Sequence, residues 1–408
     1  MGDAAQYVQY AKNLISHRTF SKDKGPSKPV SDSYWAPGLP AFIAINMIVG
    51  DRIGVDSYRL FMYAQILLGI LTVMLTFVLG RMFLDPIWSL LASVLVGFSP
   101  HLISIGRCVL TETLFSFLLL AGIYSFSLGY IRRSRSAFCI SGMVFGLTYL
   151  VNPVMFFTPI LLTLTAYYLN KKNKNSQSIR FNLNMVFCLI LFISIMSAWS
   201  FRNSINVPPD QPSSSDRLLT NLIIGSHSDF YEIWRADPID PLNPATQDEQ
   251  SIKGSYKKFA HTLSSRIVNN PGQYVKWYLV DKPILLWSWN IVTGQGDIYI
   301  YPVKSSLYHK SGIAKISYMA MKFSHYFLVG FGFFGIFFLL KNKGVANCIP
   351  AFLYITIIYI SAVYIVTQAE PRYSIPLRPE IYLAATFFMS QLSQFRTSLP
   401  PLDKFLVH

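Results

Sequence analysis

Glu112 is an isolated carboxylate in an apolar part of the sequence. It lies in "CVLTETLF" (108–115), and between Asp85 and Arg132 the only other formal charge is Arg107. A glutamate in the first turn of a helix is favoured by the helix dipole, and Thr111 before it is a candidate cap. A carboxylate near membrane depth is costly and commonly marks a functional cavity. The residues alone leave a structural and a catalytic interpretation open.

Three arginines are candidate phosphate ligands, because the planar guanidinium matches phosphate oxygens. Arg372 and Arg378 lie in "QAEPRYSIPLRPE" (368–380), where three prolines prevent a continuous helix. Arg202 lies in "SAWSFRN" (197–203), at the end of an apolar segment. The alternatives are contact with lipid headgroups for Arg372 and Arg378, and a favourable helix C-terminus for Arg202.

The composition indicates an integral membrane protein. The chain has 408 residues, of which 52% are hydrophobic and 13% are charged, whereas soluble domains carry about 25% charged residues. The net charge is +15, and many of the basic residues lie in short loops between apolar segments, which is typical of cytoplasmic loops and not of a nucleic-acid partner. The four cysteines lack the spacing of a disulfide framework or a zinc site.

Apolar segments predict about nine transmembrane helices in an all-α polytopic fold. The segments are 60–80, 86–104, 112–131, 137–151, 153–170, 181–200, 323–340, 346–366 and 376–394. The fourth and fifth are short and are separated by "VNPV", so they are either two short spans or a broken pair. The basic loops "RRSR" (132–135), "KKNKNSQSIR" (171–180) and "KNK" (341–343) are expected on the cytoplasmic side.

This topology divides the chain into five regions, and all the candidate residues fall on the outer face. The regions are an outer-face loop with interfacial helices (1–58), the first part of the membrane core (59–201), a mostly helical outer-face loop region (202–322), the last part of the core (323–394) and a cytoplasmic tail (395–408). Within the long loop, "QYVKWYLVDKPILLWSW" (273–289) is rich in aromatic residues. It is interpreted either as an interfacial aromatic belt or as a substrate-lining segment.

Several motifs in a fixed order resemble the C-type glycosyltransferase superfamily. They are "DAAQYVQYAKNL" (3–14), "YWAPGLPAFIA" (34–44), "SPHLISIGRCVLTETLFSFLLL" (99–120), "LVNP" (150–153), "AWSFRN" (198–203) and "EPRYSIPLRP" (370–379). The chain is most similar to the bacterial branch related to dolichyl-phosphate-mannose–protein mannosyltransferases and to the lipid A aminoarabinose transferase. The resemblance covers nearly the whole sequence.

The resemblance implies transfer of a sugar from a polyprenyl-phosphate donor to an acceptor hydroxyl on a protein, lipid A or a surface glycan. The reaction would take place on the outer face of the bacterial inner (plasma) membrane. Asp3 matches the family's acceptor-side acid, and nothing else in the sequence singles it out. Glu112 matches the second acid, while Arg372 and Tyr373 match a motif that meets the lipid-linked phosphate. The acids would serve the acceptor and the oxocarbenium-like sugar, and the arginine the leaving phosphate.

The sequence departs from the family pattern in its first motif. Members usually begin with a membrane span before that motif, and this span is missing, so we expect about 20 apolar residues to be encoded upstream of Met1. The first motif often holds two adjacent acids, but Ala4 follows Asp3 here. Some relatives place a divalent ion between such acids and others use none, and two carboxylates make a poor site for a hard cation. No metal ligands are therefore predicted, although the resemblance leaves a divalent cation open as a weakly supported cofactor.

Two other functions remain open from the sequence. A transporter or flippase of lipid-linked sugars would also need cations and a cavity on one face, although transporters often contain internal repeats and none is evident here. A polymerase or ligase of surface glycans would use the same donor chemistry with a different acceptor.

Overall fold

The computed structural model describes residues 2–25, 29–172, 179–230, 233, 242–252, 254–289, 310–341 and 348–397. Over these ranges it has helices and no strand, with one isolated β-bridge between Ser33 and Ser213. The predicted all-α polytopic fold is therefore confirmed. Residues 173–178 of the predicted loop 171–180, residues 342 and 343 of the predicted loop 341–343, and the tail beyond 397 lie outside the described residues.

Each apolar segment predicted from the sequence is mainly helical over its described residues, but the segments 86–104 and 323–340 are each divided between two helices. The first group is α3 (Ser57–Gly80), α4 (Pro86–Gly97), α5 (Pro100–Ile105), α6 (Glu112–Arg132), α7 (Arg135–Val151), α8 (Thr158–Lys172) and α9 (Ile179–Asn206). The second group is α17 (Gly312–Phe334), α18 (Ile336–Lys341), α19 (Cys348–Val366) and α21 (Arg378–Thr397). The "VNPV" stretch breaks the helix as predicted, because α7 ends at Val151 and a 3₁₀ turn over Pro153–Met155 precedes α8.

The protein is a multi-pass membrane protein, but the predicted number of nine spans is not established. Within the described ranges, six helical stretches are long and apolar enough to cross a bilayer: Ser57–Gly80, Glu112–Arg132, Pro153–Lys171, Leu183–Asn206, Gly312–Leu339 and Cys348–Val366. Two further apolar helices, Pro86–Gly97 and Arg135–Val151, are shorter than a full span.

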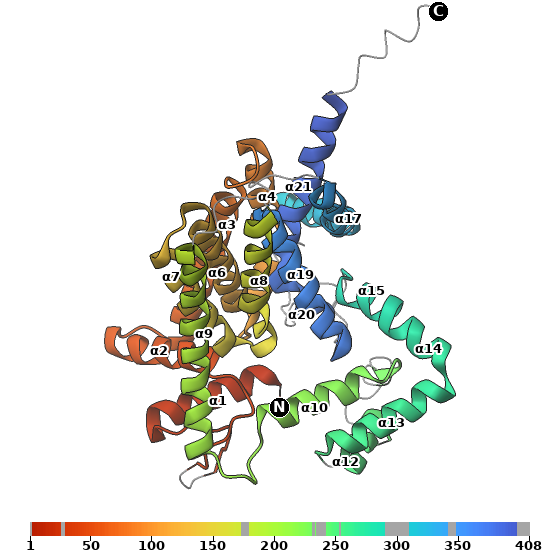
Figure 1. The fold of residues 1–408 in the computed structure, drawn as a ribbon. Helices are drawn as coiled ribbons and strands as arrows, with labels where there is room; N and C mark the ends of the chain where they lie inside the picture. Colours follow the sequence, from red (N-terminus) through yellow and green to blue (C-terminus); the bar gives the residue numbers. More distant parts are fainter. Residues whose placement is uncertain are drawn as a thin grey trace, which may run out of the picture.

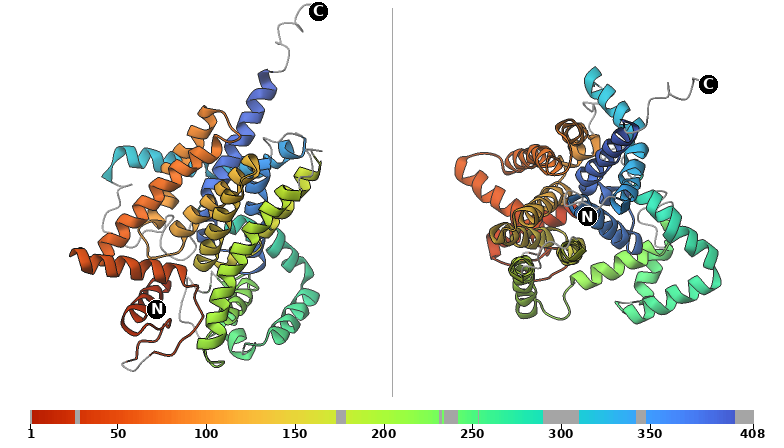
Figure 2. Two further views of the ribbon diagram at one scale, coloured as in Figure 1. Left: turned by 60° about the vertical axis from the view of Figure 1, so that its left-hand side comes forward. Right: turned by 45° about the horizontal axis from the view of Figure 1, so that its top comes forward.

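A second set of helices gathers at one end of this bundle. It consists of α1 (Asp3–His17), α2 (Gly38–Ile53), α10 (Ser214–Gly225), α12 (Pro244–Ile252), α13 (Tyr256–Asn269), α14 (Pro271–Lys276), a π-helical turn (Trp277–Asp281), α15 (Lys282–Leu286) and α20 (Pro371–Ser374). In Figure 1, α1 and α2 lie below the bundle on one side, and α10 to α15 form an arc on the other. The left view of Figure 2 shows α1, α2 and this arc in the lower part of the molecule, away from the C-terminus at the top.

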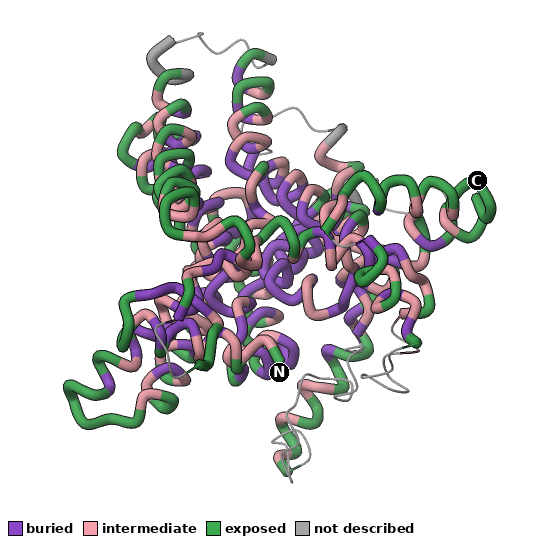
Figure 3. The backbone as a smooth tube through the Cα atoms, turned by 90° about the horizontal axis from the view of Figure 1, so that it is seen from below, coloured by how far each residue is buried: buried purple, intermediate pink, exposed green. Residues whose placement is uncertain are grey.

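The buried core is centred on α6, which packs between α3 and α7. Leu119, Leu120, Ile123 and Phe126 on this helix are fully buried, and burial in Figure 3 is concentrated at the middle of the molecule. The neighbouring pair α7 and α9 meet backbone to backbone, because a Cβ atom added to Gly142 would lie 2.3 Å from the carbonyl oxygen of Cys188. Small residues permit such close contact between membrane helices.

Helix α1 is held by the segment that follows it. The buried Tyr10 hydroxyl donates a hydrogen bond to the carboxylate of Asp32, and Trp35 Nε1 donates to Gln6 Oε1 at 2.8 Å. Arg202, at the end of α9, donates to the backbone oxygen of Asp32 at 3.2 Å. These contacts fix the first helix of the chain against the end of α9.

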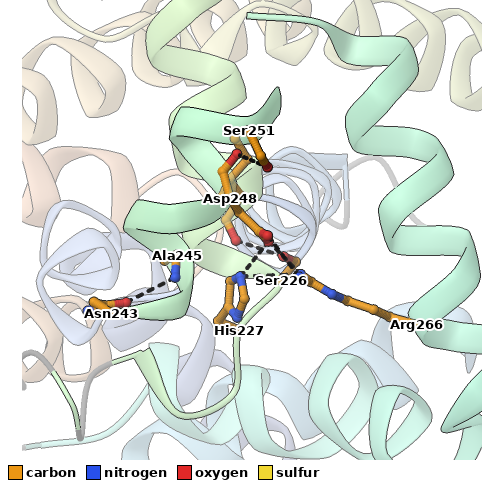
Figure 4. A network of polar contacts seen from close by, with 8 residues as sticks. Ser226, His227, Asn243, Ala245, Asp248, Ser251 and Arg266 are labelled. Carbon is orange, nitrogen blue, oxygen red and sulfur yellow. Dashed lines mark hydrogen bonds and ion pairs between the residues drawn. The ribbon is translucent and has the colours of Figure 1, made fainter. Parts of the chain in front are cut away.

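The arc of α10 to α15 contains a polar network of its own, drawn in Figure 4. Asp248 on α12 accepts from His227 Nε2 at 2.8 Å and from Arg266 Nη2 on α13 at 2.9 Å. Burial alone would raise the pKa of Asp248, but the hydrogen bonds from Arg266 and His227 lower it. Over its described residues, the region predicted as a long loop (202–322) therefore contains packed helices.

The contact between α7 and α9 generates a stability prediction. Gly142→Ala should lower the free energy of unfolding of the purified protein by about 1–3 kcal/mol, because the new methyl group would clash with the backbone of α9. Gly69→Ala is the matched control, since the Cβ atom it adds to α3 meets nothing within 4 Å. Equal thermal midpoints for the two variants in the same detergent would contradict the packing argument.

Candidate functional site

A pocket of about 350 Å³ lies where α1, α6, α10 and the turn between α19 and α20 meet. Its size is at the lower end of the range found for ligand sites. Five charged side chains line it: Asp3, Glu112, Glu370, Arg217 and Arg372. Three acids and two guanidinium groups therefore converge from parts of the sequence up to 369 positions apart.

Arg372 is at the centre of this charged group. Its Nη2 atom lies 3.2 Å from Asp3 Oδ2 and 4.0 Å from Glu370 Oε2, and its Nε atom lies 3.3 Å from Glu112 Oε1. The Glu112 and Glu370 side chains are 6% and 4% exposed, whereas that of Asp3 is 36% exposed. Burial alone would lower the pKa of Arg372, but the carboxylates of Glu370 and Glu112, with Asp3, raise it.

Local sequence explains how the acids reach Arg372. Asp3 and Glu112 are the first residues of α1 and α6, where a carboxylate is favoured by the positive end of the helix dipole. Thr111 is the N-cap residue of α6, but its side chain makes no capping hydrogen bond. Pro371 occupies the first position of the short helix α20, so this helix begins directly after the extended residue Glu370, and Arg372 follows in its first turn.

An aromatic pair forms another part of the pocket lining. Tyr373 stacks on Tyr364 of α19 with ring centroids 4.8 Å apart and an interplanar angle of 18°. Asn152, at the "LVNP" motif, donates to the Tyr364 hydroxyl oxygen at 3.1 Å. Burial, with a smaller contribution from Glu370, raises the pKa of Tyr373, so its hydroxyl is retained as a donor.

The structure brings four of the six predicted site residues into the pocket: Asp3, Glu112, Arg372 and Tyr373. Arg202 and Arg378 are absent from the lining. Arg202 contacts the segment around Asp32, and its guanidinium lies 5.0 Å from the ring centroid of Trp199.

Arg378 is fully buried in a different cluster. Its Nη1 atom lies 3.2 Å from His325 Nδ1, its Nη2 atom donates to Ser374 Oγ at 3.1 Å, and its guanidinium lies 5.5 Å from the Trp287 ring centroid. The phosphate-binding roles predicted for Arg202 and Arg378 remain predictions, and any such site would be separate from this pocket.

Sequence reasoning missed Arg217 and Glu370. Arg217 lies on α10 with its guanidinium 4.4 Å from the Trp35 ring centroid. Over the described ranges, no carboxylate forms an ion pair with it. The sequence does carry a signal for Arg217. Arg217, Thr220, Asn221 and Ile224 recur at the three- and four-residue spacing of one helix face, and in the structure all four line the pocket.

The acids in this arrangement do not fit a divalent cation. The Arg372 guanidinium lies in contact with both Asp3 and Glu112, so the charges of these carboxylates are already balanced by a cation of the chain itself. Across the part of the chain that the structure describes, no group of three or more histidine, cysteine, aspartate or glutamate side chains has metal-binding geometry. The carboxylates here are ligands of a guanidinium group.

A comparison with protein families matches residues 36–199 to the family described as dolichyl-phosphate-mannose-protein mannosyltransferase. This match confirms the resemblance to C-type membrane glycosyltransferases that the ordered motifs indicated. The matched residues contain Glu112, but Asp3, Arg217 and Arg372 lie outside them. No curated protein gives a significant match.

Solved structures share the fold. One is the archaeal oligosaccharyltransferase AglB from Archaeoglobus fulgidus, in complex with an inhibitory peptide and a dolichol-phosphate. It aligns with a TM-score of 0.55 and 14% identity over 100% of this chain and 48% of that chain. The apo form of the Archaeoglobus fulgidus oligosaccharyltransferase aligns with a TM-score of 0.54 and 13% identity, over 97% and 47% of the two chains. The chain thus spans about half the length of these structures.

The environment of Arg372 generates a prediction about stability. Arg372→Met should destabilise the protein by about 3–5 kcal/mol, because it leaves the buried carboxylates of Glu112 and Glu370 without their cation. Thermal unfolding in detergent would measure the loss. The further change Glu370→Gln should restore part of it by removing one of those charges.

Arg107→Met is the control for this prediction, because Arg107 is an exposed arginine close to Glu112 in sequence. A thermal midpoint for Arg372→Met equal to that of Arg107→Met would show that the carboxylates do not depend on the guanidinium.

Proposed function

We propose that the chain is a glycosyltransferase that moves a sugar from a polyprenyl-phosphate donor to an acceptor hydroxyl at this pocket. The observation that carries the proposal is the meeting of three carboxylates and two guanidinium groups in one cavity at the end of a membrane helix bundle. The acceptor would be a protein, lipid A or a surface glycan. The pocket would face the outside of the bacterial inner membrane, in agreement with the basic loops expected on the other side.

In this reaction a bond forms between the acceptor oxygen and the anomeric carbon of the sugar, and the bond from that carbon to the phosphate oxygen breaks. The acceptor proton passes to a carboxylate, and polyprenyl phosphate leaves. Asp3 is the most exposed of the three acids, which suits a base that must reach an incoming hydroxyl. Glu112 is buried and suits stabilisation of positive charge developing on the sugar.

Binding of the donor phosphate needs a cation whose charge is not already neutralised. Arg372 is shared among three carboxylates, whereas Arg217 has no ion-pair partner within the described residues. We therefore assign the first contact with the donor phosphate to Arg217. Arg372 also forms ion pairs with the three acids and so fixes their positions. Tyr373 remains a predicted contact of the donor.

The rival function is transport of a lipid-linked sugar without chemistry. Purified protein incubated with a donor carrying a labelled sugar, plus an extract containing acceptors, would separate the two. The transferase should release polyprenyl phosphate and place label on an acceptor. Intact donor after prolonged incubation with folded protein would contradict the proposed function.

Glu112→Gln tests the acid directly, because it keeps the size of the side chain and removes its charge. We expect turnover to fall at least about a hundredfold, the scale for removing a group that stabilises charge in the transition state. Membrane insertion should be unchanged. Full activity in this variant would leave Glu112 only a role at the start of α6.

Arg217→Met tests the assignment of the phosphate contact. Donor KM should rise about tenfold with a smaller change in kcat, because binding of the ground state and transition state is weakened together. Lys257→Met on the neighbouring α13 is the control, since Lys257 is exposed and lies outside the pocket lining. Equal donor KM values for the two variants would return the phosphate contact to Arg372.

A further inference from the structure

Lys282, the first residue of α15 in the arc of α10 to α15, is fully buried and lies outside the pocket lining. Its Nζ atom donates to the carbonyl oxygen of Gly225 at 2.9 Å and to that of Thr367 at 2.7 Å. The acceptors lie 57 and 85 positions away in the sequence. One side chain therefore joins three distant segments.

Both acceptors are carbonyl groups at the C-terminal ends of helices. Gly225 is the last residue of α10, and Thr367 directly follows the last residue of α19. Such carbonyls have no partner within their own helix, and a cation nearby is favoured by the helix dipole. The single amino group of Lys282 thus donates hydrogen bonds to terminal carbonyl groups of two helices.

The π-helical turn before Lys282 explains how it reaches this position. Trp277 Nε1 also donates to the Gly225 oxygen, at 3.0 Å, so residues 277 and 282 point to one atom. In a regular α-helix, residues five apart are rotated by about 140°. The π turn at Trp277–Asp281 reduces that rotation, and such turns often occur at functional sites.

The contact leaves no room for a side chain at Gly225. A Cβ atom built there would lie 1.6 Å from the Thr367 oxygen, so only glycine allows α10 to approach the end of α19 this closely. Burial lowers the pKa of Lys282 to about 7. The amine and ammonium forms each have at least two N–H donors, enough for both carbonyls.

The two segments that Lys282 joins form two walls of the pocket. Helix α10 carries Arg217, Thr220 and Asn221 into the lining, and Thr367 begins the turn that leads to Glu370 and Arg372. We infer that Lys282 is a positioning residue, which holds the α10 wall in register with the Arg372 turn and thereby sets the geometry of sugar transfer. The inference rests on the proposed function for the reaction, but the clamp itself is a property of the fold.

Lys282→Met tests the clamp by keeping an apolar stem of similar length and removing the donors. Hydrogen exchange of the α10 amides should become at least about tenfold faster, because the helix loses a buried tie. Under the proposed reaction, kcat should fall about 10- to 100-fold, the scale expected for misplaced reacting groups, with a smaller change in donor KM. The control is Lys276→Met, which removes an exposed lysine paired with Asp281.

Gly225→Ala breaks the same contact from the other side and should reproduce both effects. Exchange rates and kcat in both variants within twofold of the Lys276→Met control would overturn the inference. Faster exchange with unchanged kcat would also overturn it, because Lys282 would then be structural only. If wild-type protein releases no polyprenyl phosphate, the proposed function fails, and the exchange data alone decide whether Lys282 clamps the two segments.

Discussion

The rest of this site depends on the ion pairs between the Arg372 guanidinium group and three carboxylates. The guanidinium group is the shared partner of carboxylates from α1, from α6 and from the residue just before α20. Two of those carboxylates are almost completely buried, and buried acids without a cation would oppose folding or take up protons. Asp3 and Glu112 begin α1 and α6, and Glu370 directly precedes α20. The packing of these helices brings the three acids to one cation.

The position of Asp3 depends on a chain of contacts that extends away from the pocket. Tyr10 holds Asp32, and Asp32 in turn accepts from Arg202 at the end of α9. An acid in the first turn of the first helix is therefore ordered by tertiary contacts with a membrane helix about 200 residues later. Arg202 lies outside the pocket, yet it stabilises the segment that holds Asp3 in place.

The helices could be predicted from the sequence because each apolar segment is long and its loops are marked by charge or proline. Glu112 could also be found, since a carboxylate is rare in such a segment. Asp3 came only from the resemblance, because an acid near the start of a chain carries no local sign of burial. Arg217 was missed because its helix lies in a region with no membrane-like pattern, although its face has regular spacing.

Arg372 and Arg378 show the limit of a motif. Both occur in the same proline-rich stretch and have the same chemistry, so sequence alone assigned them the same role. In the fold, Arg372 meets carboxylates while Arg378 meets His325 and Ser374 in a separate buried cluster. Arg372 lies in α20 and Arg378 is the first residue of α21. Tertiary packing decides what each side chain faces, and nothing in the local pattern encodes it.

The balance of charge in the pocket has a consequence for the end of the proposed reaction. With all five groups ionised, the three carboxylates and two guanidinium groups leave one formal negative charge. The donor enters as a phosphodiester with a single negative charge, but the product lipid phosphate is a monoester that approaches two negative charges at neutral pH. In the proposed reaction the acceptor proton first neutralises one carboxylate of the pocket. Once that proton has left, the pocket regains its negative charge and repels the product lipid phosphate more strongly than it repelled the donor, which favours departure of the spent lipid.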